Sequence, residues 1–219
     1  MPFTSRPLLS RRALVAGLAA LPVTLPASGL TRVLAQTRDA RRVPYELVED
    51  ALALPGAAYV GAEHPDVIMV EFFDYNCPFC SQSAQDMAQL IDIDEHLGYV
   101  LVNYAILGEP SVEATRIALA FQGLYGNEHY RDFHLGLYAL RGVKNGQRAL
   151  DVAVDLGADG HDLVEFADSD LVTMAMESAI TAGNNLNINA TPSFAIGPWI
   201  YDGQIPLEGK LRIIDALRA

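Results

Sequence analysis

Val67-Ile68-Met69-Val70-Glu71-Phe72-Phe73-Asp74-Tyr75-Asn76-Cys77-Pro78-Phe79-Cys80 is the stretch that decides the fold, and it contains both cysteines of the 219-residue chain. The near-continuous apolar run over 67–73 is typical of a buried central strand. A helix is expected to begin at the tetrapeptide, because proline suits the first helical position. Cys77 would then lie at the helix N-terminus, where unpaired backbone N–H groups and the helix dipole favour a thiolate. The stretch therefore predicts a strand, a reactive dithiol and a helix, in that order.

Two other interpretations of the cysteine pair are open. A structural disulfide is one, but it would close a loop so short that it removes little entropy from the unfolded chain. A zinc site is the other, and it needs about four ligands, whereas the sequence has no second CxxC motif to complete one. His129 and His134 lie five residues apart and are interpreted as helix-surface residues. We therefore expect a redox dithiol and no metal site.

Helix and strand patterns alternate around this stretch. A short edge strand is predicted at 57–60 and a second strand at Tyr99–Ile106, which is rich in β-type residues. The helix after the tetrapeptide carries apolar residues at helical spacing, which predicts a buried face. This stripe comprises Ala84, Met87, Ala88 and Ile91.

Residues 109–187 are predicted to form an all-helical insertion. Ser111 is expected to cap its first helix, since a serine hydroxyl accepts hydrogen bonds from the free N–H groups of a first turn. Glycines separate the helical stretches that follow. The later helices are predicted at 128–140, 147–156, 161–167 and 170–186.

Strand patterns return after the helical block. Ser193–Ile196 and Trp199–Tyr201 flank Gly197-Pro198, which is a hairpin signal. The order of strand, cysteine-bearing helix, strand, helical block, hairpin and helix predicts an α/β fold with an inserted helical subdomain. A final helix is expected after Pro206, and its apolar face comprises Leu207, Leu211, Ile214 and Leu217.

The first 35 residues are interpreted as an export signal peptide. They begin with basic residues, continue with a moderately apolar stretch and end in Val33-Leu34-Ala35, a small-residue cleavage pattern. Ser10–Val15 resembles the twin-arginine motif, so we expect export to the periplasm by that route or by the general secretory route. Glycines and prolines interrupt the apolar stretch, which makes it a poor permanent membrane span.

Removal of residues 1–35 leaves 184 residues, with 36–56 as a short leader segment and 57–219 as one domain. Four arginines and no acidic residue leave with the signal, so the formal net charge moves from −12 to −16. An acidic surface of this kind argues against nucleic acid and anionic membrane as partners. No stable membrane span is expected in the mature chain.

Three ordered motifs resemble the DsbA-like family of exported thiol–disulfide oxidoreductases, in its ScsC-like subgroup of envelope proteins. The first is Phe72–Cys80, which matches the pattern Phe-Phe-Asp-Tyr-Asn-Cys-x-x-Cys. The second is Ile106-Leu107-Gly108 followed by 111–114, and the third is Thr191–Phe194. The resemblance extends from about residue 57 to the C-terminus and implies a thioredoxin-like fold in which the helical block is an insertion.

The resemblance also implies roles for the residues of these motifs. Cys77 would be the nucleophile and Cys80 the resolving thiol of a redox-active disulfide, with no other cofactor. Glu71, six residues before Cys77, matches a buried acid that assists proton transfer at the inner thiol. Pro192 matches a cis-proline, which would place the backbone of Thr191 beside the dithiol for pairing with an extended substrate.

Pro78 and Phe79 complete the active-site loop between the cysteines. The reduction potentials of CxxC proteins depend largely on how well the reduced thiolate is stabilised. Phe79 lacks the positive charge that a histidine would bring to this position. The protein is therefore expected to be a milder oxidant than a histidine-bearing relative.

The expected function is the oxidation of protein dithiols to disulfides through a mixed disulfide. The partners would be cysteine-containing exported proteins and a membrane redox partner that recycles the dithiol. Two alternatives are open: a disulfide isomerase or reductase of envelope proteins, and a protein that handles copper(I) with two soft thiolates. Isomerases of this group usually carry an N-terminal oligomerisation arm, for which residues 36–56 are short.

Overall fold

Strand β3 (Val67–Phe73) lies at the centre of the sheet in the computed structural model, which describes residues 40–219. Its parallel neighbour is β4 (Leu97–Asn103), and its antiparallel neighbour on the other side is β5 (Ser193–Ile196). The complete order is β1-β6-β5-β3-β4-β2. The prediction of a buried central strand is confirmed, whereas the predicted signal peptide lies outside the described residues.

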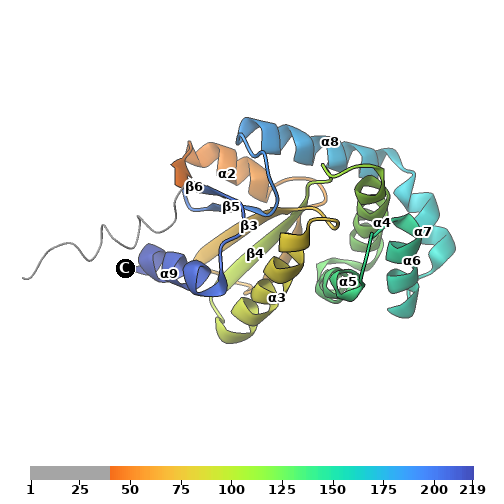
Figure 1. Cartoon of the computed structure of the whole chain (residues 1–219), viewed down its shortest axis with the longest axis horizontal. Helices are drawn as coiled ribbons and strands as arrows, with labels where there is room; N and C mark the ends of the chain where they lie inside the picture. The colour runs from red at the N-terminus through yellow and green to blue at the C-terminus, as the bar shows by residue number, and fades with distance from the viewer. Residues whose placement is uncertain (1–39) are drawn as a thin grey trace, which may run out of the picture.

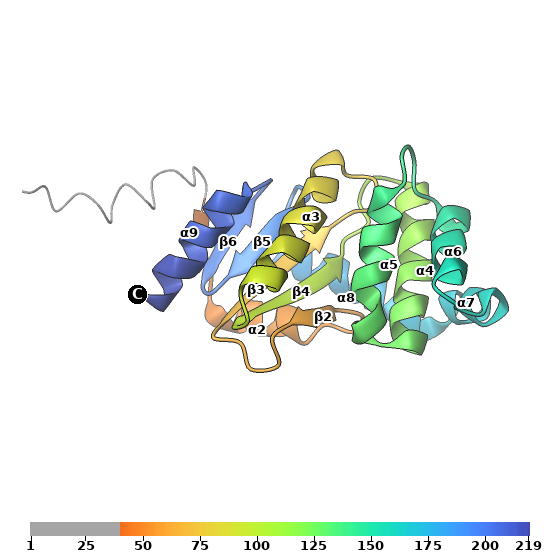
Figure 2. The same ribbon diagram turned by 90° about the horizontal axis from the view of Figure 1, so that it is seen from below.

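The two faces of the sheet build two separate hydrophobic cores. Met69 and Phe73 of β3 belong to one core, and Val70 and Phe72 to the other, because alternate side chains of a strand point to opposite faces. Figures 1 and 2 show helices on both faces of the sheet. One face carries α3 (Pro78–Ile93) and α9 (Leu207–Arg218), and the other carries α2 (Tyr45–Leu52) and α8 (Asp170–Asn185).

One end of this layered core is covered by four helices of the insertion, as Figure 2 shows: α4 (Glu109–Tyr125), α5 (Asn127–Ala139), α6 (Gly146–Asp155) and α7 (Gly160–Ala167). The fifth helix of the insertion, α8, packs on a face of the sheet. Helix α4 contacts each of the other insertion helices, and α5 contacts both α3 and the edge strand β2 (Ala58–Gly61). The α/β class and the inserted all-helical subdomain are confirmed.

The C-terminal hairpin is formed by β5 and β6 (Trp199–Asp202), as the sequence predicts. Gly197 adopts a positive φ of 54° in its turn, a conformation that costs glycine little. Strand β1 (Ala40–Arg42) adds to the free edge of β6, where Arg41 forms an ion pair with Asp202 at 3.0 Å. The sequence predicted no strand at 40–42.

Two local predictions are wrong, and Asp74 explains both. The predicted strand Tyr99–Ile106 is instead β4 over 97–103, because the backbone N–H groups of Ile106 and Leu107 donate to the Asp74 carboxylate at 2.9 Å each. Ser111 does not cap α4, which follows Gly108. It is buried in the first turn and donates to Asp74 at 2.7 Å.

The buried faces of two helices also differ from the predictions. On α3, the predicted residues Ala84 and Met87 are buried, but Ala88 and Ile91 are only partly buried. The buried face instead includes Cys80, Ser83, Asp86 and Leu90. On α5, His134 is only 1% exposed, so its interpretation as a helix-surface residue is wrong. His134 is buried because α5 packs against α3, whereas Ser83 and Asp86 of α3 are covered by Lys210 of α9. Neither contact is local in sequence.

Candidate active site

Cys77 is the N-cap residue of α3, and Pro78 is the first residue of the helix. The Cys77 N–H donates to the Asp74 carbonyl at 3.0 Å, which closes the turn before the helix. Cys77 is only 4% exposed, whereas Phe79 beside it is 58% exposed. Both cysteines are free thiols in the structure. The loop therefore combines a shielded sulfur with an exposed apolar side chain.

Hydrogen bonding from Cys80 lowers the pKa of Cys77 to about 6, and burial opposes this effect. Thr191 and the backbone of Phe79 contribute further hydrogen bonds that stabilise the thiolate. One contact acts in the other direction: the Thr191 carbonyl lies 3.0 Å from Cys77 Sγ and accepts from the protonated thiol. The donors outweigh this single acceptor, so Cys77 is mainly a thiolate at neutral pH.

Cys80 lies one turn further along α3 and is fully buried. Burial is the largest cause that raises its pKa well above the usual value for a thiol. The hydrogen bond with Cys77 and the negative charge of Glu71 raise the pKa of Cys80 further. Two thiols three residues apart are therefore driven to opposite protonation states, with the proton on the inner sulfur.

The loop before β5 faces the dithiol. The peptide bond between Thr191 and Pro192 is cis, and Pro192 is buried while Thr191 is half-buried. The Ser193 hydroxyl donates to the Ala190 carbonyl at 2.8 Å across this turn. The structure thus brings Thr191 and Cys77 together, although they are far apart in the sequence.

Glu71 lies on β3 and is 1% exposed. Burial raises its pKa, and the positive charge of Lys210 opposes the increase. The Tyr99 hydroxyl donates a hydrogen bond to the Glu71 carboxylate. The negative charge of the Glu71 carboxylate in turn raises the pKa of Cys80, the inner thiol. Glu71 is thus a desolvated acid close to the buried sulfur.

Asp74 and Asn76 hold the active-site turn in place; the sequence suggests a turn or capping role for Asp74 and no role for Asn76. Besides its bonds to the backbone after β4, Asp74 accepts from the Asn76 N–H at 2.8 Å. The Asn76 side chain donates to Ser111 Oγ at 3.0 Å and exchanges two bonds of 2.8 Å with the backbone of Lys144. Their place inside the Phe72–Cys80 motif was the available signal. The turn is therefore hydrogen-bonded to two parts of the helical insertion, at Ser111 and at Lys144.

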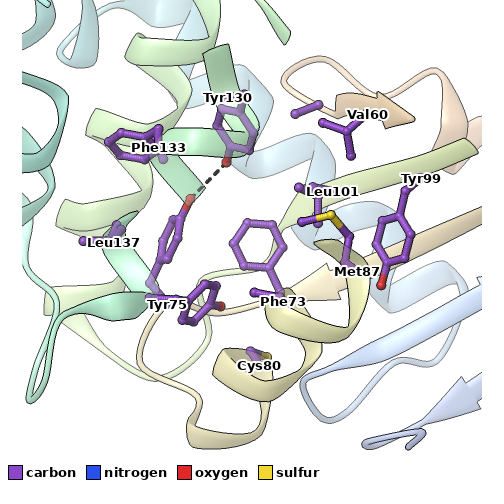
Figure 3. Packing of buried hydrophobic residues seen from close by; sticks show 14 of the residues in the cluster. Val60, Phe73, Tyr75, Cys80, Met87, Tyr99, Leu101, Tyr130, Phe133 and Leu137 are labelled. Carbon is purple, nitrogen blue, oxygen red and sulfur yellow. Dashed lines mark hydrogen bonds between the residues drawn. The ribbon is translucent and has the colours of Figure 1, made fainter. Parts of the chain in front are cut away.

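Aromatic residues fill the space between the active-site turn and α5. Figure 3 shows Tyr75 reaching toward Tyr130, with Phe73 and Cys80 nearby. The two tyrosine hydroxyls lie 3.2 Å apart, and the Tyr75 hydroxyl lies 3.4 Å from His134 Nδ1. Burial lowers the pKa of His134 to about 3, so this imidazole is neutral at neutral pH.

Within residues 40–219, no group of three or more His, Cys, Asp and Glu side chains is arranged to hold a metal ion. The same part of the chain contains no helix that is long and apolar enough to cross a membrane.

A family model described as thioredoxin matches residues 54–216. A thioredoxin-like oxidoreductase from Silicibacter pomeroyi DSS-3 is 30% identical, with a TM-score of 0.71 over 78% of this chain and 98% of that chain. The thiol–disulfide exchange protein alpha-DsbA2 from Wolbachia pipientis is 28% identical, with a TM-score of 0.72 over 78% of this chain and 92% of that chain.

The catalytic domain of Proteus mirabilis ScsC shares the fold at 16% identity, with a TM-score of 0.69 over 86% of this chain and 98% of that chain. No curated protein sequence matches. The match of the thioredoxin model to most of the chain, together with these relatives, confirms the resemblance found in the sequence. The chain therefore belongs to the thioredoxin family and, within it, to the DsbA-like thiol–disulfide oxidoreductases.

Proposed function

We propose that this protein is an exported dithiol oxidase, which transfers a Cys77–Cys80 disulfide to cysteine-containing proteins. One observation carries the proposal: the pKa of Cys77 is lowered to about 6 while that of Cys80 is raised. Hydrogen bonds that stabilise the Cys77 thiolate exist only in the reduced protein. They favour the reduced form over the disulfide, and this makes the disulfide an oxidant.

The transfer takes place in two exchange steps. A substrate thiolate attacks Cys77 Sγ, the Cys77–Cys80 bond breaks, and its electron pair leaves on Cys80. The second substrate thiolate then attacks the substrate sulfur of the mixed disulfide, and Cys77 leaves as the stabilised thiolate. The substrate loses two electrons and becomes a disulfide, and the protein gains them as a thiolate and a thiol.

Glu71 supplies the proton that Cys80 needs as it leaves. A buried thiolate is unfavourable at Cys80, because burial and the charge of Glu71 both raise its pKa. Burial also raises the pKa of Glu71, which keeps a proton available on the carboxyl group. Passing that proton to Cys80 avoids two buried negative charges side by side.

Substrate binding uses the surface around Cys77. An extended peptide that pairs with the backbone at Thr191 would present its cysteine to Cys77, which contacts this residue. Phe79 and Pro78 are exposed beside the sulfur and offer an apolar contact. Because Phe79 carries no charge, it leaves the thiolate dependent on hydrogen bonds and the helix N-terminus.

The periplasm is the proposed compartment, with a membrane redox protein that reoxidises the dithiol. The N-terminal sequence pattern supports export. A structurally similar chain is described as a periplasmic thioredoxin-like protein from Salmonella enterica serovar Typhimurium, at 19% identity. In an oxidising compartment, unfolded secreted chains offer the thiols that the proposed reaction requires.

The reduction potential of the cysteine pair tests the proposal. The protein is equilibrated in glutathione buffers, with Cys80→Ser as a control that forms no internal disulfide. We expect a reduction potential between that of thioredoxin, about −270 mV, and that of the most oxidising CxxC proteins, about −120 mV. Phe79→His is expected to raise it by about 30 mV. A value at the thioredoxin end would indicate a reductase or isomerase, and the absence of a reversible couple would exclude the proposed redox function.

A further inference from the structure

Lys210 of α9 is a fully buried cation directly behind the active-site helix. Its ammonium group donates to Ser83 Oγ at 2.9 Å and lies 3.5 Å from Asp86 Oδ2, both on α3. The ammonium also lies 4.8 Å from the centre of the Phe194 ring. Burial of a lysine is costly unless its charge is compensated, so these contacts indicate a specific role.

These contacts connect Lys210 to Glu71. Phe194 is the direct partner of Glu71 in the pairing of β5 with β3. Ser83 accepts from Lys210, and both Ser83 and the ammonium of Lys210 lower the pKa of Glu71. We call Glu71, Ser83, Asp86, Tyr99 and Lys210 the lysine cluster; every member is buried.

Each element packed around Glu71 presents a defined group to it. Strand β4 presents the Tyr99 hydroxyl, and β5 presents the uncharged Phe194. Helix α9 presents Lys210, the positive charge among the described groups that influence Glu71. Helix α3 presents the side chains of Cys80, Ser83 and Asp86, and α5 presents the hydroxyl of Tyr138, whose pKa the charge of Glu71 raises.

We infer that Lys210 is a positioning residue that controls proton transfer between Glu71 and Cys80, through its charge and its hydrogen bond to Ser83. The inference rests on the proposed function, since it assumes that Glu71 gives a proton to Cys80. When Glu71 loses that proton, its carboxylate accepts a hydrogen bond from Tyr99 and is balanced by the ammonium. Without Lys210, the cluster would hold two carboxylates and no cation.

The pH dependence of disulfide reduction tests this role. Dithiothreitol reduces the oxidised protein, samples are quenched with acid and alkylated, and rates are expressed per dithiothreitol thiolate. The rate should fall above the pH at which Glu71 loses its proton, and Glu71→Gln should abolish this inflection. Lys210→Met is expected to move the inflection upward by about one pH unit, because it removes an opposite charge.

Asp86→Asn should move the inflection downward by a smaller amount, because Asp86 is a weaker and opposite influence on Glu71. Opposite shifts from two neighbouring residues of one cluster are not expected from a loss of packing. Arg212→Met, which removes an exposed cation from the same helix, should leave the profile unchanged. An equal shift in Arg212→Met would overturn the inference, since net charge alone would then explain it.

Lys210→Met leaves Asp86 buried without its cation, so that variant can fail to fold. Lys210→Met/Asp86→Asn removes both charges and keeps the interior neutral. It is expected to retain an upward shift smaller than that of Lys210→Met, and an unshifted inflection would overturn the inference. If the wild-type protein shows no reversible couple, the proposed function fails instead; a reversible couple with unshifted profiles in the variants refutes the role of Lys210 alone.

Discussion

Two buried polar clusters lie on opposite sides of α3, and they are built from different chemistry. The lysine cluster lies between α3 and α9 and contains two carboxyl groups and an ammonium. The junction cluster lies between α3 and α5. It consists of Tyr75, Asn103, Tyr130 and His134. Figure 2 shows α9 and α5 on the two sides of α3.

The difference between the clusters follows from what each side of α3 must do. A proton can move to Cys80 only if an ionisable group is buried near it, and Glu71 is that group. The junction cluster joins the helical insertion to the sheet with neutral groups, and one of its buried atoms, Asn103 Oδ1, has no hydrogen-bond partner among the described residues. Burial keeps His134 neutral by lowering its pKa to about 3. The ionisable groups that act on Glu71 thus lie on the α9 side of α3, and His134 in the junction cluster is neutral.

Asp74 lies in the sequence between Glu71 of the lysine cluster and Tyr75 of the junction cluster. Its substitution should have the largest effect on stability. Asp74→Ala leaves the N–H groups of Asn76, Ile106 and Leu107 without their acceptor. We expect a loss of about 3–5 kcal/mol in the free energy of unfolding, measured in urea, since each unsatisfied buried donor costs about 1–3 kcal/mol. Asp92→Ala removes a surface partner of Arg131 and should cost less than about 1 kcal/mol. Equal losses in both variants would contradict this assignment.

Removing the acid from the lysine cluster should affect the reaction rather than the fold. Glu71→Gln keeps the shape of the side chain but cannot give a proton to Cys80. We expect reduction of the disulfide by a dithiol to slow by about 10²-fold at neutral pH, the lower range for general acid catalysis. The matched control is Glu63→Gln, at an exposed position. An unchanged rate in Glu71→Gln would show that Cys80 obtains its proton elsewhere.

Acid should disrupt the junction cluster by charging His134. Because the pKa of His134 is lowered to about 3, its contribution to stability is complete above about pH 6.5 and is lost as the pH falls toward 3. At pH 5 the expected loss is about 2 kcal/mol, from about 1.4 kcal/mol per pH unit. His134→Phe should remove this part of the pH dependence of unfolding. His129→Gln, at an exposed position on the same helix, should retain it.

The smallest effect is expected from a single hydroxyl of the junction cluster. Tyr130→Phe removes the group that accepts from Asn103 Nδ2 at 2.8 Å and lies beside the Tyr75 hydroxyl. We expect a loss of about 1 kcal/mol in the free energy of unfolding. The reduction potential should not change, since the lysine cluster is intact. A changed potential, absent in the exposed control Tyr45→Phe, would mean that the two clusters are coupled.

Much of the fold was predictable because many of its helices, strands and turns depend on residues that are close together in the sequence. The apolar run of β3, the proline at the start of α3 and the turn between β5 and β6 are local signals, and each predicted its element. Strand β1 was missed for the opposite reason. Its three residues carry no strand pattern, and the edge of β6 defines them as a strand.

The site was predictable in its motif residues and less so in their surroundings. Lys210 was overlooked, although it follows Leu207 by three residues and precedes Ile214 by four, which places it on the apolar face of α9. A lysine among the apolar residues of a helix face was the available signal for a buried, compensated charge. Ser111 and His134 were misplaced because their burial depends on Asp74 and on the packing of α5 against α3.

By itself, the sequence determined the reactive dithiol, the strand and helix that carry it, and the α/β architecture with a helical insertion. These depend on side-chain periodicity and on the few residues that begin or end a helix. Only the tertiary structure decided how strongly burial keeps the proton on Cys80, and which groups surround the acid that could supply one. Protonation depends on burial and on charges within a few ångströms. Glu71 and Cys80 lie on neighbouring elements of one motif, and Lys210 reaches them only because the C-terminal helix packs against α3.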